Sequence, residues 1–192
     1  MKLLAFYRLC LIAWLSCSVS VHAEDKLPTV DRVALERYSG LWYEVARLPN
    51  RFERECVGDI TATYALLPTG MVDVLNQCRK LDGALMSARG LARSADGRST
   101  SQLEVRFAPA WLGVFPFVWG DYWVIDLAAD YSWSMVGSSD RKYFWILSRQ
   151  PAMDKTQIDR LLKKAQAIGF DTKQVVFVKN MARETMPVPR AN

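Results

Sequence analysis

Histidine is nearly absent from this 192-residue sequence, since its only histidine is His22. Residues 1–23 combine a basic start, a short apolar run and the small-residue cleavage signal Val21-His22-Ala23, a pattern typical of a secretory signal peptide. Removing this leader leaves a mature chain with no histidine and no cluster of metal ligands, which disfavours metal-dependent and histidine-dependent catalysis. We therefore expect no metal, no cofactor and no enzyme activity.

Long apolar runs are also missing. The apolar part of the leader is interrupted by Arg8 and is too short to span a membrane comfortably. Two cleavage sites are possible for the leader. The motif LSCS around Cys17 loosely resembles the lipobox at which bacteria cut and lipidate a cysteine, with Trp14 where leucine is usual. Cleavage after Ala23 would release the exported protein into the periplasm, whereas lipidation of Cys17 would anchor it to the outer membrane.

An excess of charge of one sign is missing too. The formal net charge is +5, and it falls to +3 without Lys2 and Arg8 of the leader. This charge is too small and too evenly scattered to indicate a nucleic-acid partner. The composition favours one domain, over residues 24–182 with a flexible tail at 183–192, because 51% hydrophobic residues suffice for one sizeable core.

Cysteine is scarce. Of the 4 cysteines, Cys10 and Cys17 belong to the leader, which leaves Cys56 and Cys78. Thiols of an exported protein meet an oxidising environment, so a disulfide between these two is the simplest expectation, and two free thiols are the alternative. A disulfide that closes a loop of this length contributes about 3 kcal/mol by the chain-entropy estimate.

Short β-like runs separated by turn residues make up most of the chain from residue 41 to residue 149. The runs recur at a spacing of roughly ten residues, and Gly, Pro, Asp and Ser fill the segments between them. This pattern predicts an all-β barrel or sandwich of antiparallel strands. The predicted strands are 41–48, 57–67, 71–78, 85–93, 102–108, 122–127, 131–137 and 143–149.

The hydrophobic period changes after the last of these strands. Apolar residues at helical spacing predict one amphipathic helix within residues 153–170, with Asp154 as its N-cap and Gly169 as its stop signal. A helix with one apolar stripe needs a surface to cover, and the flank of the β unit is the only candidate. A short final strand is predicted within residues 173–179.

If the eight strands run up and down in order, particular residues meet at each end of a barrel. Trp42, near the start of the first strand, and Arg149, at the end of the last, lie at the same end. A guanidinium over the face of the indole ring would plug that end. Cys56 and Cys78 both lie at the opposite end, where they can form the disulfide.

The segment 108–120 lies at the same rim as the two cysteines. It is too apolar for an ordinary exposed loop. It therefore forms either a lid over the mouth of the barrel or a contact surface for a membrane or a partner. Its aromatic side chains are Trp111, Phe115, Phe117 and Trp119.

Three short motifs carry a resemblance to a known family. Gly40-Leu41-Trp42 opens the first strand, Asp130-Tyr131 lies at the turn before the seventh, and Arg149 ends the eighth. In this order and at these separations they resemble the three signatures of the lipocalins, and within them of the bacterial outer-membrane lipocalin group related to apolipoprotein D. The resemblance runs from about residue 33 to residue 179 and departs at the leader, where members commonly have a cleaner lipobox.

The resemblance implies an eight-stranded up-and-down antiparallel barrel with a cup-like cavity, one flanking C-terminal α-helix and a short final strand. It also implies non-catalytic binding, storage or transport of a fatty acid or lysophospholipid in the bacterial cell envelope; we expect a monomer or a weak dimer. A barrel of this size is just wide enough for one slender apolar molecule. Burying about a dozen methylenes offers on the order of 10 kcal/mol before ordering costs.

Strand alternation predicts which side chains point into the cavity. If Trp42 and Arg149 point inward, Glu44 and Ala46 do so on the first strand. A buried carboxylate needs a partner, so Glu44 makes either an internal salt bridge or hydrogen bond, or a polar contact to the ligand. The other predicted cavity residues are Trp133 and Met135 on the seventh strand and Tyr143, Trp145 and Leu147 on the eighth.

Two other functions are open at this point. A lipocalin-type enzyme acting on a lipid would have to use Glu44, Asp126 or a tyrosine, because the mature chain has no histidine. A barrel whose core is filled by its own side chains would instead serve a membrane surface or a protein partner through the segment 108–120.

Overall fold

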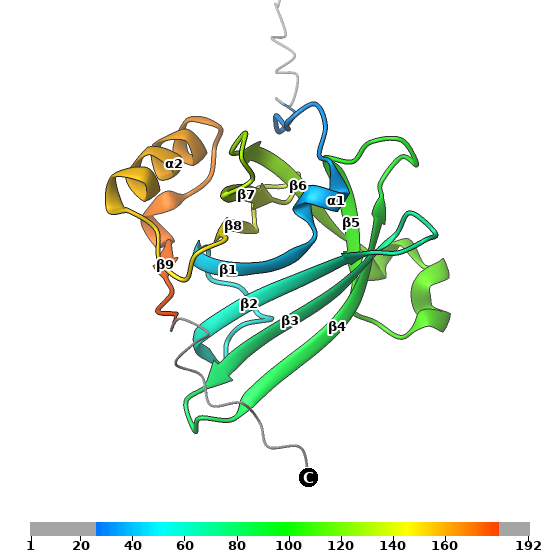
Figure 1. The fold of residues 1–192 in the computed structure, drawn as a ribbon, viewed down its shortest axis with the longest axis horizontal. Coiled ribbons are helices and arrows are strands. Elements are labelled where there is room, and N and C mark those ends of the chain that lie inside the picture. Colours follow the sequence, from blue (N-terminus) through cyan, green and yellow to red (C-terminus); the bar gives the residue numbers. More distant parts are fainter. Residues whose placement is uncertain (1–25, 181–192) are drawn as a thin grey trace, which may run out of the picture.

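The computed structural model describes residues 26–180, in which a strongly curved antiparallel sheet wraps into a barrel with one long helix beside it (Figure 1). The predicted signal peptide 1–23, the candidate lipidation site Cys17 and the predicted tail 183–192 lie outside the described residues. None of the helices within residues 26–180 is long and apolar enough to cross a membrane.

Eight strands form the wall of the barrel, and a ninth short strand extends the sheet. Hydrogen-bonded neighbours follow the order β2-β3-β4-β5-β6-β7-β8-β1-β9, and β1 also pairs with β2, which closes the barrel. The strands are β1 (Gly40–Arg47), β2 (Cys56–Leu66), β3 (Val72–Lys80), β4 (Leu85–Ser94), β5 (Gln102–Arg106), β6 (Gly120–Leu127), β7 (Trp133–Gly137), β8 (Phe144–Ser148) and β9 (Val176–Phe177). The predicted up-and-down antiparallel barrel with a short final strand is confirmed.

The sequence pattern does not predict four short elements. α1 (Leu35–Tyr38) is a single helical turn before β1, and two 3₁₀ helices, η1 (Ala110–Val114) and η2 (Pro116–Val118), lie between β5 and β6. A further 3₁₀ turn, η3 (Thr172–Gln174), leads into β9. Single turns are too short to show a helical period and depend on their surroundings for stability, so the sequence alone gives little signal for them.

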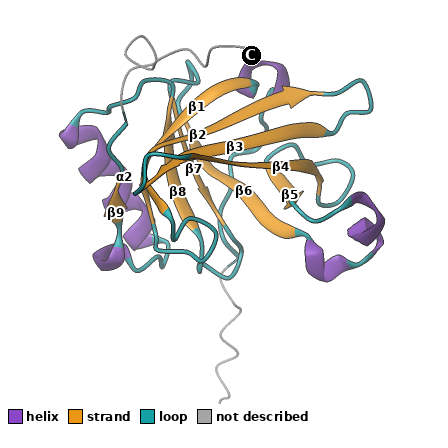
Figure 2. Ribbon diagram, turned by 90° about the horizontal axis from the view of Figure 1, so that it is seen from below, coloured by secondary structure: helices purple, strands orange, loops and turns teal. Residues whose placement is uncertain are grey.

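The helix α2 (Lys155–Ala167) begins and ends where the sequence indicates. The carboxylate of Asp154 accepts two backbone N–H hydrogen bonds from the first turn, at 2.8 and 3.2 Å, and Gly169 follows the helix with a φ of 97°. Its buried side chains, Leu161 and Ala165, pack on the outer wall of the barrel. Figure 2 shows α2 and β9 together at one side of the sheet.

Buried apolar side chains form two clusters, one on each side of the barrel wall. The inner cluster surrounds Trp42 and includes Tyr38, Tyr64, Val136 and Leu147. The outer cluster lies between the wall and α2, and it includes Val45, Met135, Phe144, Ile146 and Phe170. Because β1 faces the interior on one side and the outer cluster on the other, its residues from Trp42 to Arg47 are all buried.

The predicted orientation of β7 is wrong. Ser134 pairs with Leu147 and Val136 pairs with Trp145, and partners across an antiparallel pair share a face, so Ser134 and Val136 point into the barrel. Trp133 and Met135 therefore point outward, and Met135 is fully buried in the cluster under α2. The physical reason is volume: the helix needs large apolar partners outside, while Trp42 and the tyrosines already fill this level inside.

The predicted inward orientation of Ala46 on the first strand is also wrong, because the strand contains a bulge. The register between β1 and β8 shifts between Glu44, which pairs with Leu147, and Ala46, which pairs with Ile146. This shift places Ala46 in the outer cluster and turns Arg47, which pairs with Trp145, toward the interior. Simple alternation thus holds for Trp42 and Glu44 and fails beyond them.

Candidate ligand-binding site

One end of the barrel is closed by Trp42 and Arg149. Trp42 is fully buried, and the guanidinium carbon of Arg149 lies 3.8 Å from the centroid of its ring. The guanidinium also donates hydrogen bonds to four backbone carbonyls between residues 37 and 41, at 2.7 to 3.1 Å. Gly40 has a φ of 97°, and a Cβ there would lie 3.4 Å from the guanidinium. We call this closed end the floor.

The Asp130-Tyr131 turn lies at the floor too. The Asp130 carboxylate accepts hydrogen bonds from the backbone N–H and hydroxyl of Ser132, which hold the pKa of Asp130 below its ordinary value. The Tyr131 hydroxyl accepts from the backbone N–H of Ala34 at 2.9 Å, and the Arg37 guanidinium lies 4.0 Å from the ring. These contacts tie the turn to the segment before β1, so this motif holds the floor together.

A chain of hydroxyl groups lies above the floor inside the barrel. The Tyr122 hydroxyl lies 3.0 Å from that of Tyr38 and 2.9 Å from that of Tyr64, and the Tyr38 hydroxyl donates to Ser134 at 3.0 Å. Burial raises the pKa of Tyr38 to about 12 and raises the pKa values of Tyr64 and Tyr122 well above the ordinary value. The hydroxyls are therefore neutral at physiological pH and satisfy one another in an otherwise apolar core.

An ionic cluster joins β1 to the loop that follows it. Arg47 Nη1 donates to Glu44 Oε1 at 3.0 Å, and Arg47 Nε lies 2.8 Å from Glu53 Oε2. Burial, followed by the negative charge of Glu53, raises the pKa of Glu44 well above its ordinary value, against the opposing effect of Arg47. Of the two roles considered for Glu44, the internal salt bridge is present in the structure.

Aromatic side chains connect this ionic cluster to the open end. Trp145 Nε1 donates to Glu53 Oε1 at 3.4 Å, and the ring of Tyr143 stacks on Trp145 with centroids 5.9 Å apart and planes 7° from parallel. The Phe52 ring lies 5.7 Å from Tyr143. Phe52 and Glu53 belong to the loop between β1 and β2, so this loop folds over the interior side chains of β8.

The wall opposite these aromatic rings includes small side chains. On β4, Ala92 belongs to the inner cluster, and strand alternation places Gly90, Ala88 and Met86 on the same face. The β3–β4 pairing continues without a register shift from Val72 to Arg79, so no bulge interrupts the alternation of inward and outward side chains. Ala88 is nevertheless exposed. A side chain that faces inward and still meets solvent marks a hollow part of the barrel.

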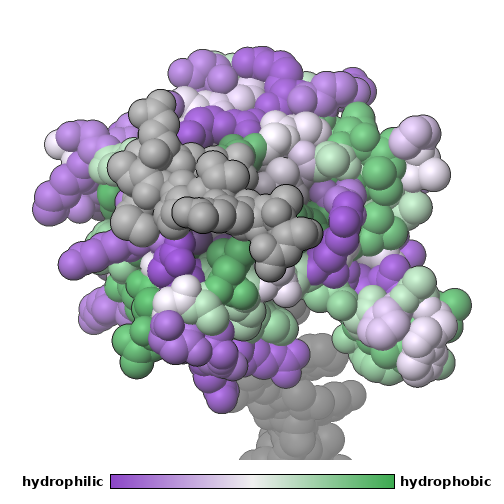
Figure 3. All heavy atoms as spheres, turned by 60° about the horizontal axis from the view of Figure 1, so that its bottom comes forward, coloured by the Kyte–Doolittle hydropathy of each residue, from purple (hydrophilic) through white to green (hydrophobic). Residues whose placement is uncertain are grey.

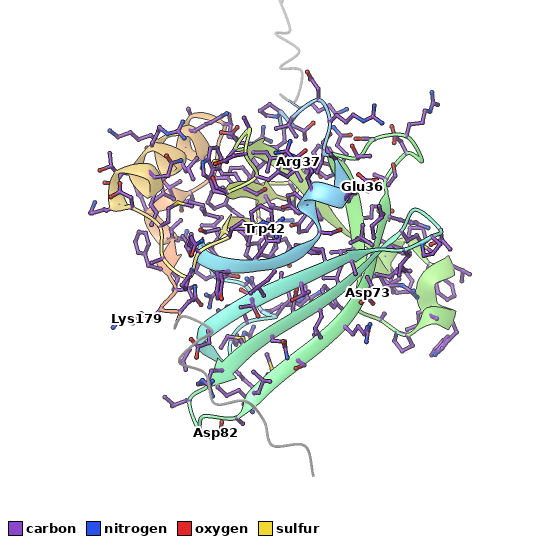
Figure 4. The ribbon with its side chains drawn as sticks, in the orientation of Figure 1. Glu36, Arg37, Trp42, Asp73, Asp82 and Lys179 are labelled. Atoms are coloured by element: carbon purple, nitrogen blue, oxygen red, sulfur yellow. A yellow bond between two sulfur atoms is a disulfide. The ribbon has the colours of Figure 1, made fainter. Side chains whose placement is uncertain are left out.

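The disulfide is confirmed and lies at this open end. Cys56 and Cys78 are bonded, with their Cα atoms 5.6 Å apart and 22 residues apart in the chain. Cys56 opens β2, and Cys78 lies near the end of β3, close to the turn that holds Asp82. In Figure 4, Asp82 lies at the far tip of the β3–β4 hairpin from Trp42. We call this open end the mouth.

Two surface hollows lie outside the barrel interior. One, of about 450 Å³, lies between the start of α2, β9 and the outer face of β1, and the other, of about 510 Å³, lies beside the β3–β4 turn. The first is lined by Val45 and Phe177, and the second by Arg54 and Lys80. Neither touches Glu44 or Trp145, so both are separate from the interior side chains described above.

The segment between β5 and β6 does not fold into the barrel as a lid. Trp111 and Phe117 are 73% and 80% exposed, and in Figure 3 the segment stands clear of the barrel at the lower right. Trp119 at its base is held by stacking, because the guanidinium carbons of Arg93 and Arg106 lie 3.9 and 5.1 Å from its ring centroid. Of the two alternatives for this segment, the exposed surface is the one present.

The acids considered for catalysis are separated. Asp126 lies on the outer wall opposite Met135, and its carboxylate pairs with Lys164 of α2 at 2.8 Å. Asp126 therefore cannot act on a molecule inside the barrel. Within residues 26–180, no group of three or more His, Cys, Asp or Glu side chains could hold a metal ion.

Sequence reasoning missed several interior residues. Strand alternation predicts that Arg47 points outward, and the bulge turns its side chain inward. Alternation makes no prediction for Glu53, because Glu53 lies in a loop. Tyr64 and Tyr122 could have been found, because strand alternation applied to the predicted strands 57–67 and 122–127 would have considered both as interior residues. Tyr38 belongs to α1 and gave no strand signal at all.

A closed antiparallel barrel that is plugged at one end and open at the other defines the class of protein. A family model described as a lipocalin-like domain matches residues 33–180, and the chain belongs to the lipocalin family. The chain is 37% identical to temperature-induced lipocalin-1 of Arabidopsis thaliana over 150 residues, which cover 77% of this chain and 80% of that protein.

The chain is also similar to bacterial and animal proteins. The chain is 31% identical to the outer membrane lipoprotein Blc of Vibrio cholerae over 169 residues, 85% of this chain and 94% of that protein. It is 29% identical to apolipoprotein D of Mus musculus over 157 residues, 77% of each chain. These relatives confirm the expected Blc and apolipoprotein D group within the lipocalins.

Solved structures share the fold. Insecticyanin of the tobacco hornworm Manduca sexta superposes with a TM-score of 0.61 at 19% identity, covering 83% of this chain and 86% of that one. The cockroach allergen Per a 4 gives 0.62 at 15% identity, with 80% and 92% covered. At these identities the likeness shows the fold alone.

Proposed function

We propose that this protein binds one fatty acid or lysophospholipid without catalysis and stores or carries it in the bacterial cell envelope. The observation that supports this most is the inner face of β4, where Ala88 faces inward and is still exposed, opposite Trp145 and Tyr143. A slender acyl chain fits a hollow between small side chains and a flat aromatic wall. Burial of its methylenes, at roughly 0.8 kcal/mol each, supplies the affinity.

The polar groups inside the barrel support binding rather than reaction. The hydroxyls of Tyr38, Tyr64 and Tyr122 bond to one another and are neutral, and Glu44 is held by Arg47. Catalysis needs an acid or base positioned with freedom to exchange a proton. We therefore assign to Tyr143, Trp145 and Leu147 the role of ligand contacts, keep Glu44 as the partner of Arg47, and withdraw Trp133 and Met135, which point outward.

The envelope location rests on the relatives and on the leader. Proteins named outer membrane lipoprotein Blc align with 31 to 35% identity, and the predicted signal peptide supplies the means of export. Mass measurement of the mature N-terminus distinguishes the two leaders: a chain starting at Glu24 is a free periplasmic protein, and a lipidated chain starting at Cys17 is anchored.

The test is to fill the proposed hollow. Ala88→Phe places a ring on the inner face of β4, and Ala65→Phe places the same ring on an exposed position of β2 that faces outward. Binding of oleate and of lysophosphatidylcholine to delipidated protein is measured by isothermal titration calorimetry. We expect Ala88→Phe to weaken binding about tenfold or more and Ala65→Phe to leave it unchanged, with both variants unfolding as the parent does.

Two results would contradict the proposal. The first is a delipidated parent protein that binds neither ligand at micromolar concentration. The second is equal binding by the parent and by Ala88→Phe. Either result would favour a barrel whose interior is filled by its own side chains.

A further inference from the structure

The segment between β5 and β6 forms an apolar projection, which we define as residues 107–119. It contains no charged side chain over its whole length. Its most exposed side chains are large and apolar: Trp111, Val114 and Phe117 are 73%, 79% and 80% exposed. Contiguous exposed apolar groups of this kind mark a contact surface, because leaving them in water is unfavourable.

The backbone of the projection is satisfied in part from within. The N–H groups of Leu112, Phe115, Val118 and Trp119 donate to carbonyls of the same segment at 3.0 to 3.3 Å, and the Trp119 side chain donates to the carbonyl of Gly113 at 2.9 Å. Pro109 and Pro116 have no N–H to satisfy. Each of these internal bonds lowers the cost of moving the segment from water to a less polar medium.

The base of the projection is cationic. The Trp119 ring lies against Arg93 and Arg106, at 3.9 and 5.1 Å from the guanidinium carbons. Arg106 also donates to the carbonyl of Pro109 at 2.8 Å, and it forms no ion pair within residues 26–180. Arg93 pairs with Glu104 but keeps 44% of its side chain exposed. Arg106 is buried, with 8% exposure, so Arg93 carries the accessible positive charge behind the apolar tip.

We infer that the projection docks the barrel onto a lipid bilayer that contains anionic phospholipid. The tip would enter the boundary between head groups and acyl chains, where tryptophan and phenylalanine are favoured, and the exposed part of Arg93 would lie at the level of the phosphates. A bilayer fits better than a protein partner, because the tip presents no charged side chain that could provide directional pairing with one partner.

The position of the projection has a consequence for ligand exchange. It leaves β5 at the mouth, on the same end of the barrel as the loop that carries Phe52. Docking would therefore bring the mouth close to the lipid surface from which a ligand enters or to which it returns. This consequence rests on the proposed function, whereas the docking itself does not.

The experiment measures binding to vesicles without added ligand. The full chain carries Cys17→Ser, so that no lipid can be attached there, and it is sedimented with vesicles of phosphatidylcholine and phosphatidylglycerol in equal parts. The test variant is Trp111→Ser with Phe117→Ser. The matched control is Val176→Ser with Phe177→Ser, which removes two exposed apolar side chains from β9, on the opposite side of the barrel in Figure 1.

We expect the parent and the control to sediment with the vesicles and the test variant to bind about tenfold more weakly or worse, with all three unfolding alike. Replacing phosphatidylglycerol by phosphatidylcholine, or raising the salt concentration, should weaken binding by the parent. The Ala88→Phe variant should bind vesicles as the parent does while losing its ligand, which separates this inference from the proposed function.

Three outcomes would overturn the inference. One is a parent protein that does not bind the mixed vesicles. Another is equal loss of binding in the test and control variants. The third is a lipid-free dimer, detected by analytical ultracentrifugation, that disappears in the Trp111→Ser and Phe117→Ser variant, since a second copy of the chain would then cover the projection.

Discussion

The floor and the mouth of this barrel are built on opposite principles. At the floor, Trp42 is fully buried and the guanidinium of Arg149 donates to four backbone carbonyls. At the mouth, Phe52, Trp111 and Phe117 are exposed. Both ends are rich in aromatic and arginine side chains, so the difference lies in what surrounds those side chains rather than in their composition.

The residues that stabilise the fold therefore lie at the floor, and the residues available for function lie at the mouth. A side chain at the floor contributes through packing and satisfied hydrogen bonds, so its loss is felt by the whole fold. A side chain at the mouth has few partners to lose, and its contribution depends on a ligand or a surface. The following predictions test that division, beginning with the largest expected effect.

Trp42→Ala should destabilise the protein by about 3–5 kcal/mol, because it removes the largest fully buried side chain and leaves Arg149 over a cavity. The measurement is the free energy of unfolding from denaturant titration. Trp111→Ala at the mouth is the matched control and should change that free energy by less than about 0.5 kcal/mol. Equal losses in the two variants would remove the distinction between floor and mouth.

Replacing both Cys56 and Cys78 by serine should lower the free energy of unfolding by about 3 kcal/mol, the loop-closure contribution of a bridge across 22 residues. Cys78 pairs with Met86 at the rim, one inward-facing pair beyond Asn76 and Ala88. The affinity for oleate should therefore stay within about twofold of the parent at a temperature where both are folded. A loss of binding in the folded variant would show that the disulfide shapes the site.

Glu44→Gln should give the smallest effect, and one that depends on pH. Burial raises the pKa of Glu44 above its ordinary 4.5, so the folded state holds this proton more tightly than the unfolded state does. The stability of the parent relative to the variant should therefore fall as the pH rises from 4.5 toward 8. A parent that gains relative stability over this range would mean that Arg47 lowers the pKa instead.

Local patterns predicted most of the fold and about half of the interior. Turn residues and strand alternation predicted all eight barrel strands, and Asp154 and Gly169 predicted where α2 begins and ends. Alternation also placed Glu44, Trp145 and Leu147 correctly on the inner face. It failed for Trp133 and Met135, where both faces of the strand are buried and the pattern of apolar residues carries no direction.

The sequence by itself determined the order of strands, the helix, the pairing of the two cysteines and the meeting of Trp42 with Arg149, because each follows from local spacing and from the topology of an up-and-down barrel. Only the tertiary structure decided the bulge that turns Arg47 inward, the partners of Glu44, and the exposure of Trp111 and Phe117. These depend on which surfaces meet in space, and contacts between distant segments leave no periodic signal in the chain.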